Sequence, residues 1–595
     1  MADDAEPSLF EQISRGWRGY VLIGLIALVS SLFGAARLPV MDRDEARFAQ
    51  ATRQMVETGD YVRIRVQEDE RNKKPIGIHW LQAAAVNLTE PLTNRDNAIW
   101  AYRLPSALGA MLAAMAALWA GTALLGRRTA LYGSALFAAG ALLGFEGMTA
   151  KTDAVLVGFT TLAMAALANL YTGAKRPKLI SLVFWIALGC GVMIKGPITP
   201  MIAALTLAAL AAWERRWDWM KPLAFWPGPL LAIAIVAPWL IAIQSATDGR
   251  FFAEALGEDL APKLSGGSEG HFAPPGAHLL LLSFLVFPAT YALPFAARLG
   301  WRAARAPRND AVYESIRFLL AWIVPSFLVF ELMPTKLVHY TLPLYPAIAL
   351  LAGAGLVAAF KERWGLWHAA GVALFAIAGA ALVGLWAYGG TFIPGDADSN
   401  LRRAIASALI GGGVLIVSIA ALIFLKRTSI RVAILCACAL ALSYGLRARV
   451  LPEARTLLVS SEAVAAMQRA RLTPRANREL WVVGYGETSL VFMTNTGIHI
   501  ASPEELAAGV HVGDVLLIEG RAVADVNAAL DRRGFAFAAR GAPVVGQNIG
   551  NGDDVTLYLG QAVVRPAQLQ FSDELAGDQP PDPEPPPTPR RRGRQ

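Results

Sequence analysis

The chain has 595 residues, of which 55% are hydrophobic and only 17% are charged. A soluble protein of this size carries about 25% charged residues, so this composition excludes an ordinary soluble globular protein. The formal net charge of +8 does not predict a nucleic-acid partner, because most lysines and arginines fall in short segments between apolar runs, where they report membrane topology.

Long apolar segments recur from about residue 20 to residue 447, and many approach the ~20 residues that a helix needs to cross a bilayer. They lack the alternation of barrel strands, and in lipid only helices and closed barrels satisfy their backbone polar groups. We therefore predict an all-α polytopic membrane domain over residues 19–448 with about 13 transmembrane helices. Their approximate centres are Ala27, Ala113, Phe137, Ala163, Ala187, Leu205, Ile233, Phe284, Ile323, Ile348, Phe375, Gly413 and Ala439.

Basic residues predict how these helices are oriented. The loops after the even-numbered helices are rich in lysine and arginine, from "GRR" at 126–128 to "LKRTSIR" at 425–431. Such loops lie in the cytoplasm, so residues 1–18 should be cytoplasmic, and an odd number of helices carries the C-terminus outside. The first apolar run follows an acidic start without a small-residue cleavage site, so we expect a retained helix and not a cleaved signal.

The first outer loop, at about 38–100, opens with the acidic stretch "VMDRDEARFAQ". Asp42 is placed to cap a helix, and Glu45 three residues later would complete a variant of the capping box. Capping does not account for Asp44, which lies one helical turn before Arg47 and shares a face with it. The stretch therefore predicts both a helix start and a candidate catalytic acid.

Further charged and aromatic residues collect at the outer ends of the predicted helices. Charges held near a bilayer commonly mark a site, lysines match phosphate as point charges, and a carboxylate can accept a hydroxyl proton. Each residue alone also has a structural explanation, such as a lysine that reaches the headgroups, an interfacial aromatic or a solvated turn. The candidates are Asp42, which ranks below Asp44, and Lys73, Lys74, Lys151, Asp153, Lys195, Lys336, His339 and Tyr340.

After residue 449 the hydropathy falls. "LWVVGYGETSLVFM", "DVLLIEG" and "DVTLYLGQAVV" are typical of strands, and "SPEELAAGV" and "VADVNAALDRRG" of helices. We predict a small α/β domain outside the membrane over residues 450–565. The Pro- and Arg-rich segment 575–595 should be a disordered tail.

The motifs resemble the protein O-mannosyltransferase superfamily, including its bacterial branch that adds aminoarabinose to lipid A. The resemblance rests on "DRDEARFAQATRQMVETGDYV", "KKPIGIHWLQ", "YRLPSALGA", "AKTDAVLVGF", "KGP", "APWLIAI" and "TKLVHYTLPLYPAIALL", which follow the family order across most of the membrane part. It implies a GT-C fold and a glycosyltransferase that takes a sugar from a polyprenyl-phosphate donor, with inversion, at the outer face of the bacterial inner membrane.

The resemblance also implies roles for individual residues. Asp44 would be the catalytic carboxylate, with Glu45 beside it and Asp153 as a second acid. Arg47, Lys74, Lys336 and Tyr340 would contact the donor phosphate. The family's aromatic-rich element is missing from the second long outer loop, at about 246–276, where "HFAPPGAHLL" stands instead, so His271 is only a candidate.

Several alternatives stay open at this level. The acceptor is lipid A, another glycolipid or a protein hydroxyl, and the same lysines would also suit a transporter or flippase of lipid-linked sugar. Transporters often contain internal repeats, and none is seen here. No metal-ligand spacing appears among the cysteines and histidines, so no cofactor is predicted. A divalent metal held by two acids stays open, because metal dependence varies within the superfamily.

Overall fold

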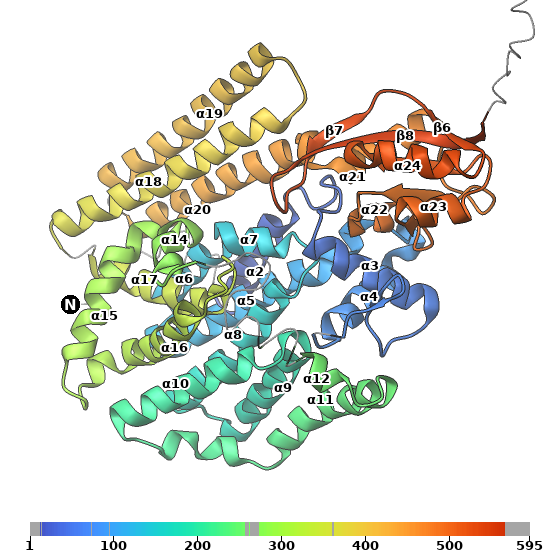
Figure 1. Ribbon diagram of the computed structural model, residues 1–595. Helices are drawn as coiled ribbons and strands as arrows, with labels where there is room; N and C mark the ends of the chain where they lie inside the picture. The colour runs from blue at the N-terminus through green and yellow to red at the C-terminus, as the bar shows by residue number, and fades with distance from the viewer. Residues whose placement is uncertain are drawn as a thin grey trace, which may run out of the picture.

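The computed structural model describes residue 12 and residues 15–72, 74–93, 96–255, 257, 261, 273–359, 362–425 and 427–565. The predicted site residues Lys73 and His271 lie outside the described residues, as do the predicted tail at 575–595 and most of residues 1–14. The described chain is largely helical, with a small sheet near the C-terminus (Figure 1).

The membrane part is a bundle of apolar helices. Its helices are α2 (Arg18–Leu32), α5 (Ile99–Leu125), α6 (Arg127–Ala138), α7 (Ala141–Gly147), α8 (Asp153–Tyr171), α9 (Pro177–Lys195), α10 (Ile198–Glu214), α11 (Pro227–Ala246), α14 (Ala277–Leu285), α15 (Leu293–Arg305), α16 (Glu314–Leu332), α17 (Tyr345–Ala359), α18 (Leu366–Gly389), α19 (Ala397–Phe424) and α20 (Thr428–Tyr444). The helical membrane architecture predicted from the sequence is confirmed.

The count of about 13 spans is not confirmed. Among the described residues, nine helices are long and apolar enough to cross a membrane, or up to 11 if each of two bent pairs counts as one span. The bent pairs are α6 with α7 and α14 with the segment that contains α15. The two remaining predicted spans correspond to the shorter apolar helices α2 and α10, so every predicted centre falls on an apolar helix or bent pair.

Close backbone packing fixes the centre of the bundle. Gly109 of α5 faces α8 so closely that a Cβ at this position would lie 2.6 Å from the Cα of Val155. Gly133 of α6 is in similar contact with α17, where a Cβ would lie 2.8 Å from the carbonyl oxygen of Ala349. Small residues let helices approach in this way, so α8, which begins at a predicted site residue, is held firmly.

Two groups of elements lie at one end of this bundle. The first group comes from the two long outer loops. The first outer loop forms α3 (Asp44–Thr58), a short hairpin of β1 (Arg65–Val66) and β2 (Asp69–Glu70), and α4 (Gly77–Thr93), and the second outer loop contains α12 (Phe251–Glu254). The second group is the C-terminal domain. The C-terminal domain comprises α21 (Val459–Arg469), β3 (Leu480–Val483), α22 (Thr488–Met493), β4 (His499–Ile500), α23 (Pro503–Gly509), β5 (Val515–Glu519), α24 (Val523–Asp531), β6 (Phe535–Ala539), β7 (Val544–Gln547) and β8 (Asp554–Val564).

The C-terminal sheet has the strand order β4-β3-β5-β8-β6, with β7 also paired to β8. The pairs β3–β4 and β3–β5 are parallel, and the pairs with β8 are antiparallel. The prediction of one strand through residue 493 is wrong in its second half. The chain turns at Gly484, which has a φ of +80°, and residues 488–493 form α22.

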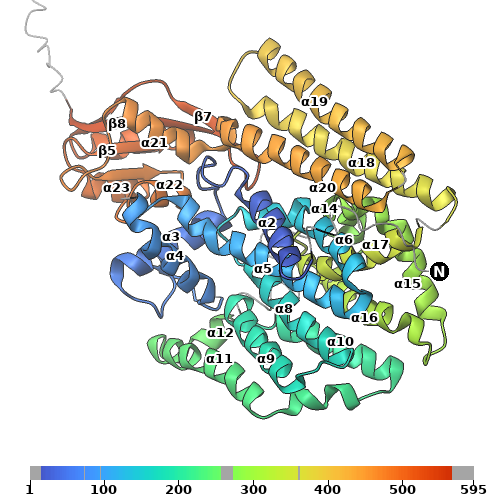
Figure 2. The same ribbon diagram turned by 180° about the vertical axis from the view of Figure 1, so that it is seen from behind.

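The first outer loop and the C-terminal domain pack against each other although about 400 residues separate them. In both views α22 lies directly against α3 (Figures 1 and 2). The rings of Tyr102 and Phe492 meet edge to face, with centroids 5.1 Å apart. The two regions therefore lie on the same side of the membrane.

Candidate active site

A cavity of about 520 Å³ opens between α8, α9, α11, α12 and the segment that joins α16 to α17. Most of its wall is apolar, with Trp239 from α11 and Phe251 and Phe252 from α12. Its polar lining consists of Lys74, Asp153, Lys195, His339 and Tyr340. Five predicted site residues from four separate segments thus line one cavity.

The helix packing explains why distant lysines meet there. A Cβ at Gly77, the first residue of α4, would lie 2.6 Å from the carbonyl oxygen of Met193. The start of α4 is thus in backbone contact with the end of α9, and this brings Lys74 and Lys195 to the same cavity. The ammonium of Lys74 also lies 5.4 Å from the ring centroid of Phe48.

Lys195 and Asp153 form the tightest ion pair of the cavity, with Nζ 2.6 Å from Oδ1. Their side chains are only 18% and 6% exposed, so the pair is largely withdrawn from water. Lys195 also lies 5.5 Å from the ring centroid of Tyr340. This arrangement fixes the lysine at the boundary between the apolar wall and the charged end of the cavity.

A second pair lies behind the first. Lys151 is 3.0 Å from Glu146, whose carboxylate is almost fully buried. His339 bridges the two pairs, because its Nδ1 is 3.7 Å from Glu146 and its Nε2 is 3.6 Å from Asp153. The result is a compact network of two acids, two lysines and one imidazole.

The charges of this network follow from its burial. Burial, assisted by Lys151 and Lys195, lowers the pKa of His339 to about 3, although Asp153 acts in the opposite direction. Burial also works against the charged form of Lys151, but Glu146 and Asp153 raise its pKa above the usual value. The imidazole is therefore neutral at physiological pH and the lysine stays charged.

The network also contains atoms of the kind that bind metals. Glu146, Asp153 and His339 each offer one ligand atom, and these atoms lie within 4.8 Å of one another. Oxygen and imidazole ligands suit a divalent cation. Both carboxylates, however, already face a lysine ammonium at 2.6–3.0 Å, so the positive charge that a metal would supply is present in the protein itself.

Asp44 begins α3 and lies near the lysines of the network, but it is not among the residues that line the cavity. Its side chain is 44% exposed and lies 4.0 Å from Arg47 one turn later. Burial alone would raise the pKa of its carboxyl, but the charges of Lys74, Lys151 and Arg47 lower it below the usual range. Of the two predicted acids in this turn, Asp44 is the one open to a ligand.

Glu45 is instead locked inside the protein. Its carboxylate receives both Nε and Nη2 of Arg103, at 2.8 and 2.7 Å, and both side chains are 1% exposed. It also accepts hydrogen bonds from the backbone N–H groups of Met41 and Ala150. These four donors make Glu45 a brace between α3, α5 and the segment before α8. Its predicted catalytic role is untested, and no oxygen of this carboxylate lacks a protein donor.

Asp42 does not cap α3, so this prediction is wrong. The N-cap is Arg43, which makes no side-chain capping hydrogen bond. Asp42 accepts a hydrogen bond from the Ser489 hydroxyl of the C-terminal domain, and Glu45 is engaged by Arg103. The capping pattern was misleading because both acids have partners elsewhere in the fold.

The ammonium of Lys336 is hydrogen-bonded to the protein backbone. It donates to the backbone carbonyls of Ala273 and Met333, at 2.9 and 2.6 Å. Neither Lys336 nor Arg47 lines the cavity. Their predicted contact with the donor phosphate stays a prediction, and this structure does not bring them together with Lys74 and Tyr340.

Three buried residues of this region were not singled out from the sequence. Glu146 pairs with Lys151, Arg103 holds Glu45, and Glu331 accepts from His278 and from the backbone N–H of Leu279. Glu146 and Glu331 lie inside apolar segments, where a charge signals a partner or a site. A charge within an apolar run is visible in the sequence, and it would have added Glu146 and Glu331 to the predicted site residues.

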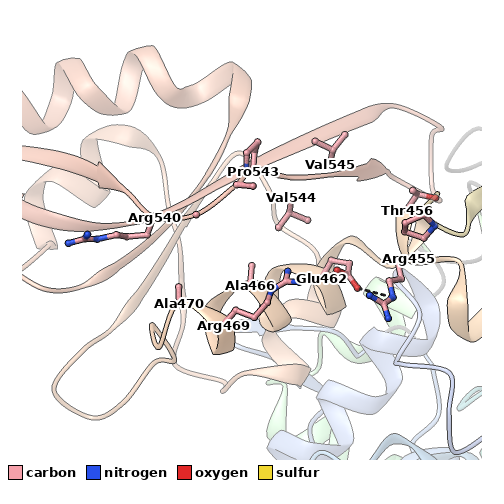
Figure 3. A pocket seen from close by; sticks show the side chains of 13 residues that line it. Arg455, Thr456, Glu462, Ala466, Arg469, Ala470, Arg540, Pro543, Val544 and Val545 are labelled. Carbon is pink, nitrogen blue, oxygen red and sulfur yellow. Dashed lines mark ion pairs between the residues drawn. The ribbon is translucent and has the colours of Figure 1, made fainter. Parts of the chain in front are cut away.

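A second hollow, of about 610 Å³, lies on the C-terminal domain (Figure 3). Arg455 and Arg469 flank Glu462 on its helical side, and Val544 and Val545 of β7 form the other side. Arg455 is 3.7 Å from Glu462. None of the predicted site residues lines this groove.

Comparisons with known proteins agree with this geometry. Residues 73–241 match the family model described as dolichyl-phosphate-mannose-protein mannosyltransferase. The chain is 28% identical over 333 residues to the undecaprenyl phosphate-alpha-4-amino-4-deoxy-L-arabinose arabinosyl transferase of Pectobacterium atrosepticum, covering 54% of this chain and 56% of that protein. The corresponding protein of Aeromonas hydrophila is 27% identical over 332 residues, covering 54% and 57%. The matches thus span little more than half of these relatives.

The fold extends further than the sequence match. The crystal structure of ArnT from Cupriavidus metallidurans bound to undecaprenyl phosphate superposes with a TM-score of 0.70 at 18% identity, covering 90% of this chain and 97% of that one. Its apo structure gives a TM-score of 0.69 at 17% identity and covers 91% and 97%. The chain thus has the GT-C fold of ArnT, and residues 73–241 are similar in sequence to the dolichyl-phosphate-mannose-protein mannosyltransferase family.

Proposed function

We propose that this protein is an integral-membrane glycosyltransferase that moves a sugar from a polyprenyl-phosphate donor to an acceptor outside the cytoplasm. The observation that carries the proposal is the cavity itself, in which an apolar wall ends at Lys74, Lys195 and Tyr340. A polyprenyl phosphate has the same two parts, a long apolar chain and one anionic group. The named relatives and the ArnT fold support the same conclusion.

The chemistry follows from the positions of the charged groups. The lysines bind the donor phosphate and stabilise the negative charge that builds on it as the bond between the sugar C1 and the phosphate oxygen breaks. The acceptor hydroxyl oxygen attacks C1 from the opposite face, which inverts the configuration. Its proton passes to Asp44 or to water that Asp44 orients, and polyprenyl phosphate leaves.

We also propose that the reaction needs no metal. Lys151 and Lys195 lie against Glu146 and Asp153, the two acids that would otherwise attract a divalent cation. A cation at this position would have to displace two ammonium groups from a largely buried network. The lysines therefore supply the electrostatic stabilisation that metal ions supply in other sites.

The site is proposed to face the periplasm of a bacterial inner membrane, with the N-terminus in the cytoplasm. The pattern of basic loops supports this orientation. Contact between α3 and α22 requires an even number of crossings between the first outer loop and the C-terminal domain. If both bent pairs cross, the short helix α10 must cross as well.

The acceptor is proposed to be a glycolipid of the lipid A type. The likeness to the aminoarabinose transferases supports this assignment. A protein hydroxyl is the second candidate, since the matching family model describes protein mannosyltransferases. A transporter of lipid-linked sugar would use the same lysines, but it would release the sugar unchanged.

Transfer in proteoliposomes tests the proposal. Full-length protein is reconstituted with radiolabelled undecaprenyl-phosphate-linked sugar and either lipid A or a hydroxyl-bearing peptide, and product formation identifies the acceptor. Asp44→Asn should lower the rate about 10²- to 10⁴-fold, as loss of a general base does. Asp69→Asn, at an exposed position of the same loop, is the matched control.

Near-normal transfer by folded Asp44→Asn protein would remove Asp44 from the mechanism. If labelled donor crosses the membrane and no product forms, the protein is a transporter of lipid-linked sugar and not a transferase.

A further inference from the structure

A directed chain of hydrogen bonds leads from the C-terminal domain to the residue two positions before Asp44. Ser489 donates to Asp42, Ser460 lies 2.7 Å from Ser489, and Tyr485 lies 2.8 Å from Ser460. An ionised carboxylate only accepts, and each hydroxyl has one proton. With Asp42 ionised, the order of donation that satisfies all three contacts runs from Tyr485 to Ser460, from Ser460 to Ser489 and from Ser489 to Asp42.

The backbone between Asp42 and Asp44 needs such support. Arg43 has a φ of 67° and a ψ of −124°, which a residue with a side chain rarely adopts, and α3 starts there without a side-chain cap. The Arg43 side chain also packs against the turn between β7 and β8, where it fills the space in which a Cβ of Gly550 would stand. The C-terminal domain therefore contacts both the residue before the strained position and the strained residue itself.

The rest of α3 is anchored to the same domain. Arg53, whose side chain is 7% exposed, donates to the carbonyl oxygens of Phe492 and Thr494 at the end of α22. Gln50 donates to Thr496 at 2.8 Å. These contacts fix the body of α3, and the buried pair of Glu45 and Arg103 fixes its first turn from Glu45 onward. The link at Asp42 therefore acts on residues 42–44, which precede the fixed part.

We propose that Ser489 and Asp42 are positioning residues that hold Asp44 in its catalytic orientation through the start of α3. The inference rests on the proposed function, because it assigns Asp44 the role described above. Neither residue lines the cavity, and each acts through the backbone of residues 42–44. The C-terminal domain thereby contributes to the active site by positioning Asp44.

Protonation of Asp42 gives this link a pH dependence. The pKa of Asp42 is raised to about 6, mainly by burial. Glu487 acts in the same direction, and Ser489, Ser460 and Arg43 act against it. The charged or titratable groups that face Asp42 are thus Arg43 on its own segment and Glu487 and Tyr485 from the C-terminal domain. Below about pH 6 the carboxylate gains a proton, and the directed chain of hydrogen bonds loses its terminal acceptor charge.

The test compares Ser489→Ala, which removes the hydroxyl, with Ser489→Thr, which keeps it. Ser502→Ala is the control, because Ser502 caps α23 in the same domain and does not contact α3. Two readouts are used on full-length protein in lipid nanodiscs. Hydrogen–deuterium exchange reports the mobility of residues 41–48, and transfer kinetics report kcat and the donor KM.

We expect Ser489→Ala to speed exchange at residues 41–48 and to lower kcat about 10- to 100-fold, the effect of slight misplacement of a catalytic group, with the donor KM unchanged. Ser489→Thr should restore both values, and Ser502→Ala should change neither. In the wild type kcat should fall below about pH 6, and Asp42→Asn should lack this acid limb.

Unchanged exchange and unchanged kcat in folded Ser489→Ala protein would overturn the inference. An equal loss of kcat in Ser502→Ala would overturn it too, since domain stability alone would then explain the effect. If the wild type transfers no sugar, the proposed function fails, while the exchange experiment still decides whether Ser489 holds the start of α3.

Discussion

The membrane-side cavity and the groove of the C-terminal domain have similar volumes, about 520 and 610 Å³, but they hold charge in different ways. In the cavity, Lys195 and Asp153 pair at 2.6 Å with side chains that are 18% and 6% exposed. In the groove, Arg455 and Glu462 lie 3.7 Å apart with side chains 54% and 23% exposed. Exposed pairs contribute about 0–1 kcal/mol, whereas a buried charge that loses its partner costs about 3–5 kcal/mol. The manner of burial, and not the size of the hollow, distinguishes the candidate site.

The largest effect on stability should come from the brace behind the site. Glu45→Gln leaves the guanidinium of Arg103 buried without its anionic partner, so the free energy of unfolding should fall by about 3–5 kcal/mol. Thermal unfolding in detergent measures the loss, with Glu68→Gln at an exposed position of the same loop as control. A Glu45→Gln protein of normal stability that lacks activity would instead support the predicted catalytic role.

The next effect concerns the cavity pair itself. Lys195→Met removes a phosphate-binding charge and should lower kcat/KM about 100-fold, the loss expected for about 2.7 kcal/mol of transition-state stabilisation. It also leaves Asp153 unpaired, so the protein should be less stable. Adding Asp153→Asn should recover stability without recovering activity, as followed by unfolding and by transfer. Recovery of both would show that the lysine acts only as a structural partner.

Removal of metal ions tests whether the positive charge of the site comes from the lysines or from a divalent cation. If Lys151 and Lys195 supply it, extensive treatment with EDTA should leave the transfer rate within about twofold of the untreated value. Added Mg²⁺ or Mn²⁺ should then give no stimulation. A rate that collapses with EDTA and returns with one cation would assign Glu146, Asp153 and His339 as its ligands.

The smallest effect is expected in the groove. Arg469→Ser changes a side chain on an exposed surface, so stability should shift by about 0.5 kcal/mol or less and transfer should change little. Transfer kinetics with a phosphorylated glycolipid acceptor provide the measurement. A raised acceptor KM in this variant would give the groove a role in acceptor binding and would weaken the contrast between the two hollows.

Local sequence patterns predicted most of the fold. The length of the apolar runs identified the membrane helices, and the strand patterns at 514–520 and 554–564 correspond to β5 and β8. The shared outer position of Lys151, Asp153, Lys195 and His339 indicated residues that the structure brings into one network. The prediction succeeded because helix ends on the same side of a packed bundle lie close to one another.

Side-chain direction and long-range docking could not be predicted. Lys336 belongs to the same outer face, but its ammonium turns to backbone carbonyls. Asp42 and Glu45 match a capping pattern, and each is drawn to a partner 447 or 58 residues away. Periodicity describes neighbours along one element, and it has no information on a contact that two separate domains create.

The docking of α22 on α3 also has a consequence for biosynthesis. The ribosome makes the acid-bearing loop first and the domain that braces it last, after all membrane helices of the described chain. Until residues 488–496 emerge and fold, Arg53 and Gln50 lack the partners that hold α3 in the finished protein. The order of synthesis thus delays assembly of the Asp44 region until the C-terminal domain has been made.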